Sequence, residues 1–213
     1  MENFEARRDR FNFFESFENP LLNITFKLET PNFLSYCKKQ NIPAFHFFLF
    51  CLMKTLGKLD NFKYRILDNK VFKIDEIYGS YTTINEDNLF NYTRFQHSDD
   101  RAEFIKRSLA AREEAMEAET LINTGIELSP REMKNYIFIT SIPWLDFTSI
   151  QHPVFKSKSA DIPAVAWGKF TVLSEEKIVM PFSVQAHHGF VDGVHIHLLA
   201  KTLSEQIELE MKA

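Results

Sequence analysis

Two adjacent histidines near the C-terminal end carry the clearest chemical signal in this chain of 213 residues. His187 and His188 are followed by Asp192 and Gly193, at the point where an apolar strand pattern gives way to a helix pattern. A histidine titrates near neutral pH, so His188 at this junction could act as a general base. Asp192 could order the turn by pairing with a cation, and Gly193 could release the backbone into the following helix. The segment predicts a proton-transfer site at a strand-to-helix junction.

The same segment could instead be a metal site or an ordinary strand end. The potential ligands within eleven residues are His187, His188, Asp192, His195 and His197. Their spacing does not match a His-Glu-x-x-His zinc helix, and no cysteine pair accompanies them. On a helix, His195 and His197 would point about 200° apart, so they could not both bind one ion. We therefore expect no metal. A serine hydrolase is also disfavoured, because the chain has no Gly-x-Ser-x-Gly motif.

Hydrophobic periodicity predicts the elements that must position these residues. Strand patterns cover residues 21–28, 64–67, 71–74, 78–84, 89–95, 135–141, 164–173 and 177–187. Helix patterns cover residues 6–17, 43–59, 98–122 and 193–212. A further helix, ending near residue 40, should begin with Thr30 as its cap and Pro31 in its first turn. The pattern predicts an α/β (α+β) two-layer sandwich, in which helices cover a mixed, largely antiparallel sheet.

Composition favours one domain over residues 1–213. Hydrophobic residues make up 45% of the chain, and no linker-like or repeated segment stands out. The net charge of −4 argues against a nucleic acid partner. We find neither a signal peptide nor a run that could span a membrane, so we expect a cytoplasmic protein in which Cys37 and Cys51 are buried thiols. The 22 phenylalanines could pack a core, line an apolar pocket or form a subunit interface.

Five motifs, taken in order along the chain, resemble those of one known family. They are residues 7–14 (RRDRFNFF), 28–30 (LET), 140–144 (TSIPW), 168–170 (GKF) and 180–193 (MPFSVQAHHGFVDG). The last motif is the most specific, and the resemblance covers nearly the whole chain. The chain thus resembles the chloramphenicol acetyltransferases of the trimeric, histidine-motif type, within the superfamily of CoA-dependent acyltransferases.

The resemblance implies direct transfer of an acetyl group from acetyl-CoA to a hydroxyl of chloramphenicol in a ternary complex. His188 would take the proton from the acceptor hydroxyl, and such general-base help contributes about 10²–10⁴-fold in rate. Thr140 stands where the family has a serine whose hydroxyl stabilises the tetrahedral intermediate, with Ser141 as a less well oriented substitute. Asp192 would form a buried ion pair with Arg7 that holds the catalytic loop. Loss of one partner of such a pair costs about 3–5 kcal/mol.

The resemblance also implies an acceptor pocket and an assembly. Phe13, Phe14 and Phe90 match aromatic positions that line the acceptor site, although plain core packing would explain the same residues. The family forms a homotrimer with its active sites between subunits, and acetyl-CoA is a co-substrate that needs no metal. The expected role is antibiotic resistance.

Departures from the family pattern leave two alternatives open. Ala166 replaces a threonine, while Ile150 and His152 replace an aromatic and an aliphatic residue. These changes could favour another small alcohol or amine as acceptor. Thr140 in place of serine would also suit a non-catalytic CoA-binding or scaffold protein of the same fold.

Overall fold

The computed structural model describes residues 2–123, 127–154 and 160–213. Its strands are β1 (Leu21–Pro31), β2 (Tyr64–Leu67), β3 (Lys70–Lys73), β4 (Tyr78–Ile84), β5 (Phe90–Tyr92), β6 (Phe95–Gln96), β7 (Tyr136–Ser141), β8 (Ala164–Trp167), β9 (Thr171–Val172) and β10 (Lys177–His187). The main sheet has the order β1-β10-β8-β7-β4-β5, with β6 paired to β4 and β9 paired to β10. The β4–β7 and β7–β8 pairs are parallel, and the other pairs are antiparallel. Strands β2 and β3 form a separate hairpin.

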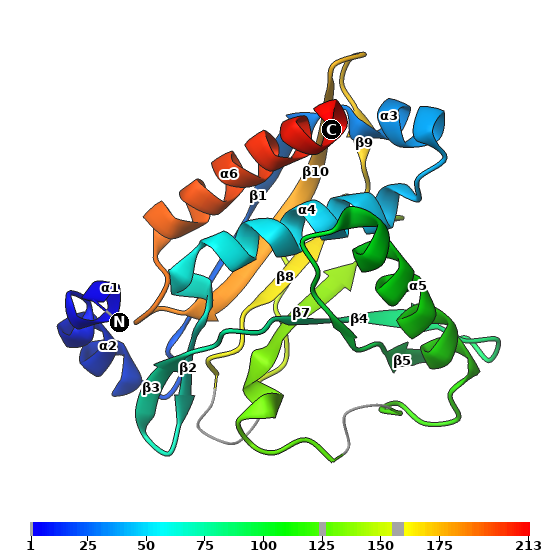
Figure 1. Ribbon diagram of the computed structural model, residues 1–213. Coiled ribbons are helices and arrows are strands. Elements are labelled where there is room, and N and C mark those ends of the chain that lie inside the picture. Colours follow the sequence, from blue (N-terminus) through cyan, green and yellow to red (C-terminus); the bar gives the residue numbers. More distant parts are fainter. Residues whose placement is uncertain (1, 124–126, 155–159) are drawn as a thin grey trace.

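Helices cover one face of the main sheet. They are α1 (Glu2–Glu5), α2 (Arg8–Glu15), α3 (Phe33–Gln40), α4 (Ala44–Lys58), α5 (Arg101–Glu117) and α6 (Gly193–Lys212), with short 3-10 turns η1 (Asp60–Phe62) and η2 (Glu132–Asn135). Figure 1 shows α4, α5 and α6 on the same side of the sheet, while α1 and α2 lie at the end where β10 leads into α6. The predicted two-layer α/β sandwich with a mixed, largely antiparallel sheet is confirmed.

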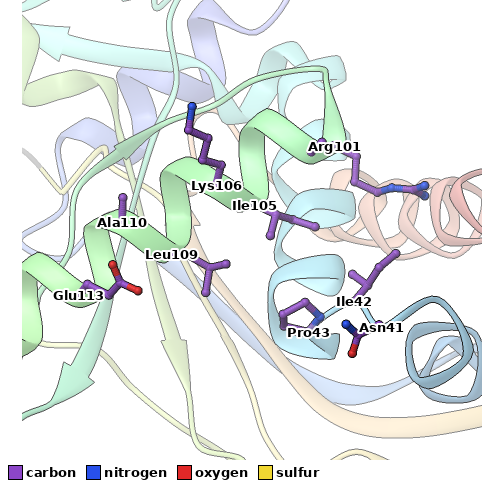
Figure 2. A pocket seen from close by; sticks show the side chains of 10 residues that line it. Asn41, Ile42, Pro43, Arg101, Ile105, Lys106, Leu109, Ala110 and Glu113 are labelled. Carbon is purple, nitrogen blue, oxygen red and sulfur yellow. The ribbon is translucent and has the colours of Figure 1, made fainter.

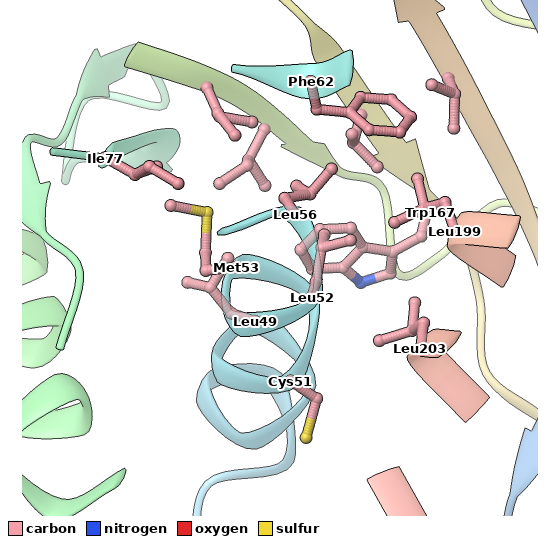
Figure 3. Close-up of a cluster of buried hydrophobic side chains, with 14 of the residues drawn as sticks. Leu49, Cys51, Leu52, Met53, Leu56, Phe62, Ile77, Trp167, Leu199 and Leu203 are labelled. Carbon is pink, nitrogen blue, oxygen red and sulfur yellow. The ribbon is translucent and has the colours of Figure 1, made fainter. Parts of the chain in front are cut away.

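The core lies between this sheet and α4. Figure 3 shows Leu49 and Met53 of α4 in a cluster that also includes Trp167 of β8 and Leu199 of α6. The ring of Trp167 packs edge-on against Phe48, with ring centroids 5.0 Å apart. Because sheet and helices surround α4, its residues are apolar around most of the circumference. The two cysteines are buried and free, as expected. No helix within the described ranges is both long enough and apolar enough to span a membrane.

The expected helix start at Thr30 and Pro31 is wrong. Both residues belong to β1, which pairs with β10 over eleven positions from Leu21↔His187 to Pro31↔Lys177. Helix α3 begins only at Phe33. A continuous ladder of backbone pairs outweighs a local cap signal, and a proline is tolerated at the end of an edge strand.

Other predicted boundaries also shift. Helix α5 begins after Asp100, whose side chain accepts the Glu103 N–H at 2.8 Å, and it ends at Glu117 rather than near residue 122. The helix predicted from residue 6 begins at Arg8. The strand predicted over residues 164–173 is divided into β8 and β9 around Gly168. A Cβ atom at Gly168 would collide with the carbonyl oxygen of Leu145 and the ring of Pro181, so the chain passes there only without a side chain.

Candidate active site

The imidazole of His188 is held in the turn that follows β10. Its Nδ1 atom lies 3.1 Å from the carbonyl oxygen of Val191. Because a carbonyl only accepts, Nδ1–H donates this bond, and in the neutral imidazole Nε2 is then the unprotonated nitrogen. The backbone N–H of His188 donates to the carbonyl of Pro20 at 2.8 Å, which joins the turn to the start of β1. The half-buried side chain is therefore in the tautomer that a general base requires.

One of the three predicted acceptor-site aromatics lies on this imidazole. The ring of Phe14, from the last turn of α2, stacks on His188 with centroids 3.9 Å apart and an interplanar angle of 19°. Phe13 packs edge-on against Phe14 and is 59% exposed. Phe90 is 53% exposed on β5, which lies at the opposite edge of the sheet from β1. Within one chain, the three rings do not form a single pocket.

Asp192 joins the start of α6 to the N-terminal segment. Its Oδ2 atom lies 3.0 Å from an Nη atom of Arg7, and its Oδ1 atom accepts the Val194 N–H at 3.1 Å. Arg7 also donates to the Gly189 carbonyl at 3.3 Å. The two charged side chains are 18% and 32% exposed, so the pair is only partly buried, not buried as expected. Burial acts to raise the pKa of Asp192, but Arg7, His195 and the Val194 N–H together hold that pKa below its ordinary value.

Thr140 lies elsewhere on the sheet. It pairs with Ala166, which pairs in turn with Ser183 of β10, four residues before His187. Strand geometry then places Thr140 roughly 13 Å along and roughly 10 Å across the sheet from the end of β10. Ser141, the possible substitute, pairs with Trp167 and so faces the helices. Within one chain, neither hydroxyl can reach an atom that reacts at His188.

Thr140 and Ala166 belong to the face of the sheet that the helices leave uncovered. Cross-strand neighbours point to the same side, so this face also carries Ser183 and Thr25, whose hydroxyl oxygens lie 2.9 Å apart. We call it the open face.

Residues 150–152 lie over the open face. The Asn23 side chain donates to the carbonyl of Ile150 at 2.6 Å, and the His152 N–H donates to Gln185 Oε1 at 3.2 Å. The Nε2 atom of His152 is buried and has no hydrogen-bond partner among the residues that the structure describes. Burial lowers the pKa of this imidazole below its ordinary value, which keeps it neutral. The three departures that could change the acceptor, at Ile150, His152 and Ala166, therefore lie on or over the open face.

The remaining histidines of the motif have separate partners. His195 Nδ1 accepts the backbone N–H of Asp192 at 3.2 Å and so completes the cap of α6, whereas His197 is exposed on another side of that helix. His187 is 1% exposed, and its Nε2 lies 3.0 Å from Oε2 of Glu15. Over the described ranges, no group of three or more His, Cys, Asp or Glu side chains is placed to bind a metal ion.

Glu15 was not among the site residues predicted from the sequence. Its partner His187 follows 172 positions later, and no local spacing signals such a contact.

Two surface cavities lie away from the predicted site residues. One, of about 650 Å³, lies between α5 and the connection from α3 to α4, where Figure 2 shows Ile42, Pro43, Ile105 and Leu109 around it. The other, of about 410 Å³, lies between β1 and α6. Neither cavity is lined by a predicted site residue.

Comparisons with known proteins agree on one family. The family model described as chloramphenicol acetyltransferase matches residues 2–204. A chloramphenicol acetyltransferase of Bacillus pumilus is 24% identical over 190 residues, which cover 89% of this chain and 84% of that relative. A solved chloramphenicol acetyltransferase matches with a TM-score of 0.85 and 27% identity over 96% of this chain and 97% of its own.

A more distant structure shares the fold alone. A probable dihydrolipoamide acetyltransferase from Listeria monocytogenes matches with a TM-score of 0.63 and 12% identity over 96% of this chain and 91% of its own. The family that the sequence motifs indicated is thus confirmed, and its enzymes use acetyl-CoA as co-substrate. The chain belongs to the chloramphenicol acetyltransferase family and is an acetyltransferase.

Proposed function

We propose that this chain transfers the acetyl group of acetyl-CoA to a hydroxyl of chloramphenicol. The observation that carries the proposal is the Nδ1 bond from His188 to the Val191 carbonyl, because it leaves Nε2 free to accept a proton. Chloramphenicol is proposed as the substrate because the relatives from Bacillus pumilus and Escherichia coli are chloramphenicol acetyltransferases.

The proposed reaction is a single addition followed by elimination. The acceptor oxygen attacks the thioester carbon while its proton passes to Nε2 of His188. The charge that develops on the carbonyl oxygen accepts a hydrogen bond from the Thr140 hydroxyl. Collapse of this intermediate expels the CoA thiolate, which takes the proton back from His188. Asp192 and Arg7 hold the turn and move no proton, since Asp192 bonds Arg7 and the helix cap rather than the imidazole.

We further propose that each site forms between two copies of one domain, residues 1–213, in a homotrimer. The wide separation of Thr140 and His188 within one chain supports this assembly, as does the distance between Phe14 and Phe90 in the sheet order. The neighbouring chain would supply the Thr140 hydroxyl that lies too far from His188 within one chain. A cytoplasmic location is proposed because acetyl-CoA is available there.

The test is thiol release from acetyl-CoA in the presence of chloramphenicol. Wild type should release thiol well above background, and both His188→Ala and His188→Gln should lose this activity while still binding acetyl-CoA. Absence of release from wild type at high enzyme concentration would refute chloramphenicol as the acceptor. If wild type and His188→Ala were equally inert with every acceptor tested and both bound acetyl-CoA, the chain would be a non-catalytic CoA-binding protein.

A second acceptor class is favoured by the open face. The Nε2 atom of His152, which is buried and has no hydrogen-bond partner among the described residues, could bind a hydroxyl in either tautomer, and Ala166 places no hydroxyl beside Thr140. This candidate function is acetyl transfer to another small alcohol or amine. Measuring kcat/KM for a panel of such acceptors and for chloramphenicol distinguishes the two candidate functions. A strong preference for chloramphenicol would eliminate the second candidate, whereas a preference for another acceptor that His152→Leu abolishes would establish it.

A further inference from the structure

We propose that Glu15 and His187 form a positioning pair that holds Phe14 against the imidazole of His188. The inference rests on the proposed role of His188 as the base. Neither Glu15 nor His187 touches the reacting atoms in this account. Both act through helix α2, which carries the Phe14 ring.

The protons in this pair can be assigned from its hydrogen bonds. The backbone N–H of Gly189 donates to His187 Nδ1 at 3.0 Å, so this nitrogen is unprotonated. His187 Nε2 therefore carries the hydrogen and donates it to the Glu15 carboxylate at 3.0 Å. Burial lowers the pKa of His187 below its ordinary value, while the negative charge of Glu15 opposes this effect. A neutral His187 thus has both ring nitrogens satisfied and one fixed orientation.

The pair fastens the C-terminal end of α2 to the end of β10. The N-terminal end of α2 is held by the ion pair between its cap residue Arg7 and Asp192. Between these two links, Phe11 stacks on Phe190 with centroids 5.2 Å apart and lies 5.6 Å from the His187 ring. Helix α2 is only eight residues long, and short helices depend on such tertiary contacts. Phe14 directly precedes Glu15, so the position of this one carboxylate governs where the Phe14 ring lies.

Gly189 lets the helix approach closely enough for this contact. A Cβ atom there would lie 2.8 Å from the Cα atom of Phe11 and 3.0 Å from atoms of the His187 ring. An alanine would have to push the α2 backbone away. Gly189→Ala should therefore displace Phe14 while Glu15 itself is unchanged, which provides a second way to disturb the same contact, through the α2 backbone and the His187 ring.

The consequence for catalysis is the direction of His188 Nε2. The Nδ1 bond to Val191 fixes one end of the imidazole, and the Phe14 ring at 3.9 Å blocks rotation of its plane. If Phe14 moves, the imidazole gains freedom and Nε2 aligns less often with the acceptor hydroxyl. Small misplacements of a catalytic group cost on the order of 10–10²-fold in rate.

The experiment compares Glu15→Ala, Glu15→Gln and Gly189→Ala with wild type. The matched control is Glu5→Gln, which breaks an exposed ion pair with Arg8 in the same N-terminal segment. Two quantities are measured: the imidazole ¹H and ¹³C resonances of His188, assigned by their loss in His188→Gln, and the kcat and KM for acetyl-CoA. The Phe14 ring shifts the His188 resonances because it stacks on them.

We expect Glu15→Ala and Gly189→Ala to move the His188 resonances and to lower kcat about tenfold with little change in KM. Glu15→Gln should keep the His188 resonances and kcat close to those of wild type, because its amide oxygen still accepts the hydrogen bond from His187 Nε2–H. Glu5→Gln should match wild type. Unchanged His188 resonances in folded Glu15→Ala and Gly189→Ala would overturn the proposal. The resonances can be read even if wild type proves inactive on chloramphenicol, so a failure of the proposed function is distinguishable from a failure of the positioning pair.

Discussion

His188 owes its orientation to contacts on three sides. The Val191 carbonyl fixes Nδ1, the Pro20 carbonyl fixes the backbone, and the Phe14 ring covers one face of the imidazole. None of these partners is a carboxylate, so the imidazole is oriented by neutral contacts rather than by an adjacent negative charge. This arrangement suits a reaction in which the acceptor hydroxyl is itself the nucleophile and the imidazole only carries its proton.

Thr140 should contribute through its hydroxyl alone. We expect Thr140→Ala to lower kcat about 10²–10³-fold, because one donor to the developing oxyanion is lost. Thr140→Ser should keep activity or raise it, since serine retains the hydroxyl and rotates more freely about χ1. Steady-state kcat and KM of both variants provide the measurement. A Thr140→Ala enzyme with full kcat would mean that another group stabilises the intermediate.

Asp192 has a capping role that can be separated from its ion pair. Serine at this position can still cap α6, whereas alanine cannot. We expect Asp192→Ala to be about 1 kcal/mol less stable than Asp192→Ser, by urea unfolding at neutral pH. Equal stabilities would show that the cap contributes nothing.

The pH dependence reports on the ion pair itself. The folded pKa of Asp192 lies below its unfolded value, so the stability from ionised Asp192 is present above the unfolded pKa. It is lost as the pH falls through the folded pKa. The free-energy difference between wild type and Asp192→Ser should therefore shrink below about pH 4. A difference that stayed constant into acid would argue against a contribution from the charge.

At the scale of elements, local signals in the sequence predicted the bounds of an element correctly where that element depends on local contacts. Helix α6 spans the predicted residues 193–212 and β4 spans 78–84. The predicted strands 64–67 and 71–74 form the β2–β3 hairpin, and its turn residues Asp68 and Asn69 have φ values of 50° and 59°, a conformation that these residue types tolerate. Thr30 failed as a predicted cap because pairing with β10 decides its conformation, and such pairing has no local signature.

The candidate site shows the same division between local and long-range information. The adjacent histidines, Asp192 and Gly193 lie in one segment, and their spacing was informative. The link between Glu15 and His187 joins positions 172 apart, so it can be identified only in the folded structure. The separation of Thr140 from His188 likewise depends on strand order and register.

The junction of α4 and α5 contains a buried histidine that should make stability depend on pH. His46 is 3% exposed, and its Nδ1 lies 2.9 Å from the Ser108 hydroxyl. Burial, with a smaller effect of Arg112, lowers the pKa of His46 to about 4. Between the ordinary pKa of about 6.5 and this value, the unfolded chain binds a proton that the folded chain does not. Stability from this site is therefore complete above pH of about 6.5 and falls towards pH 4.

The test replaces His46 by glutamine. We expect wild type to lose more unfolding free energy than His46→Gln when the pH is lowered from about 7.5 to about 5, by on the order of 2 kcal/mol. His197→Gln, on the exposed side of α6, is the control and should follow wild type. Parallel stability curves for wild type and His46→Gln would contradict the assignment.

At the scale of the whole molecule, the predicted site residues fall into two groups. His188, Phe13 and Phe14 lie at the end of β10, while Thr140 lies further along the sheet and Phe90 lies at its far edge. Phe13 and Phe90 are both more than half exposed, which is unusual for large aromatic side chains. An assembly that brings one chain's β10 end to another chain's open face would bury these rings and complete each site.

Mixed oligomers provide the direct test of this assembly. His188→Ala and Thr140→Ala should each be nearly inactive alone. After denaturation and refolding together, a mixed trimer can combine an intact His188 from one chain with an intact Thr140 from its neighbour. With random mixing in equal amounts, about one site in four would be complete. We expect thiol release to recover accordingly, whereas mixing His188→Ala with the double variant His188→Ala/Thr140→Ala should restore nothing. If native mass spectrometry shows mixed trimers but activity stays at the level of the single variants, the two residues do not meet across a subunit boundary, and each chain must build its site alone.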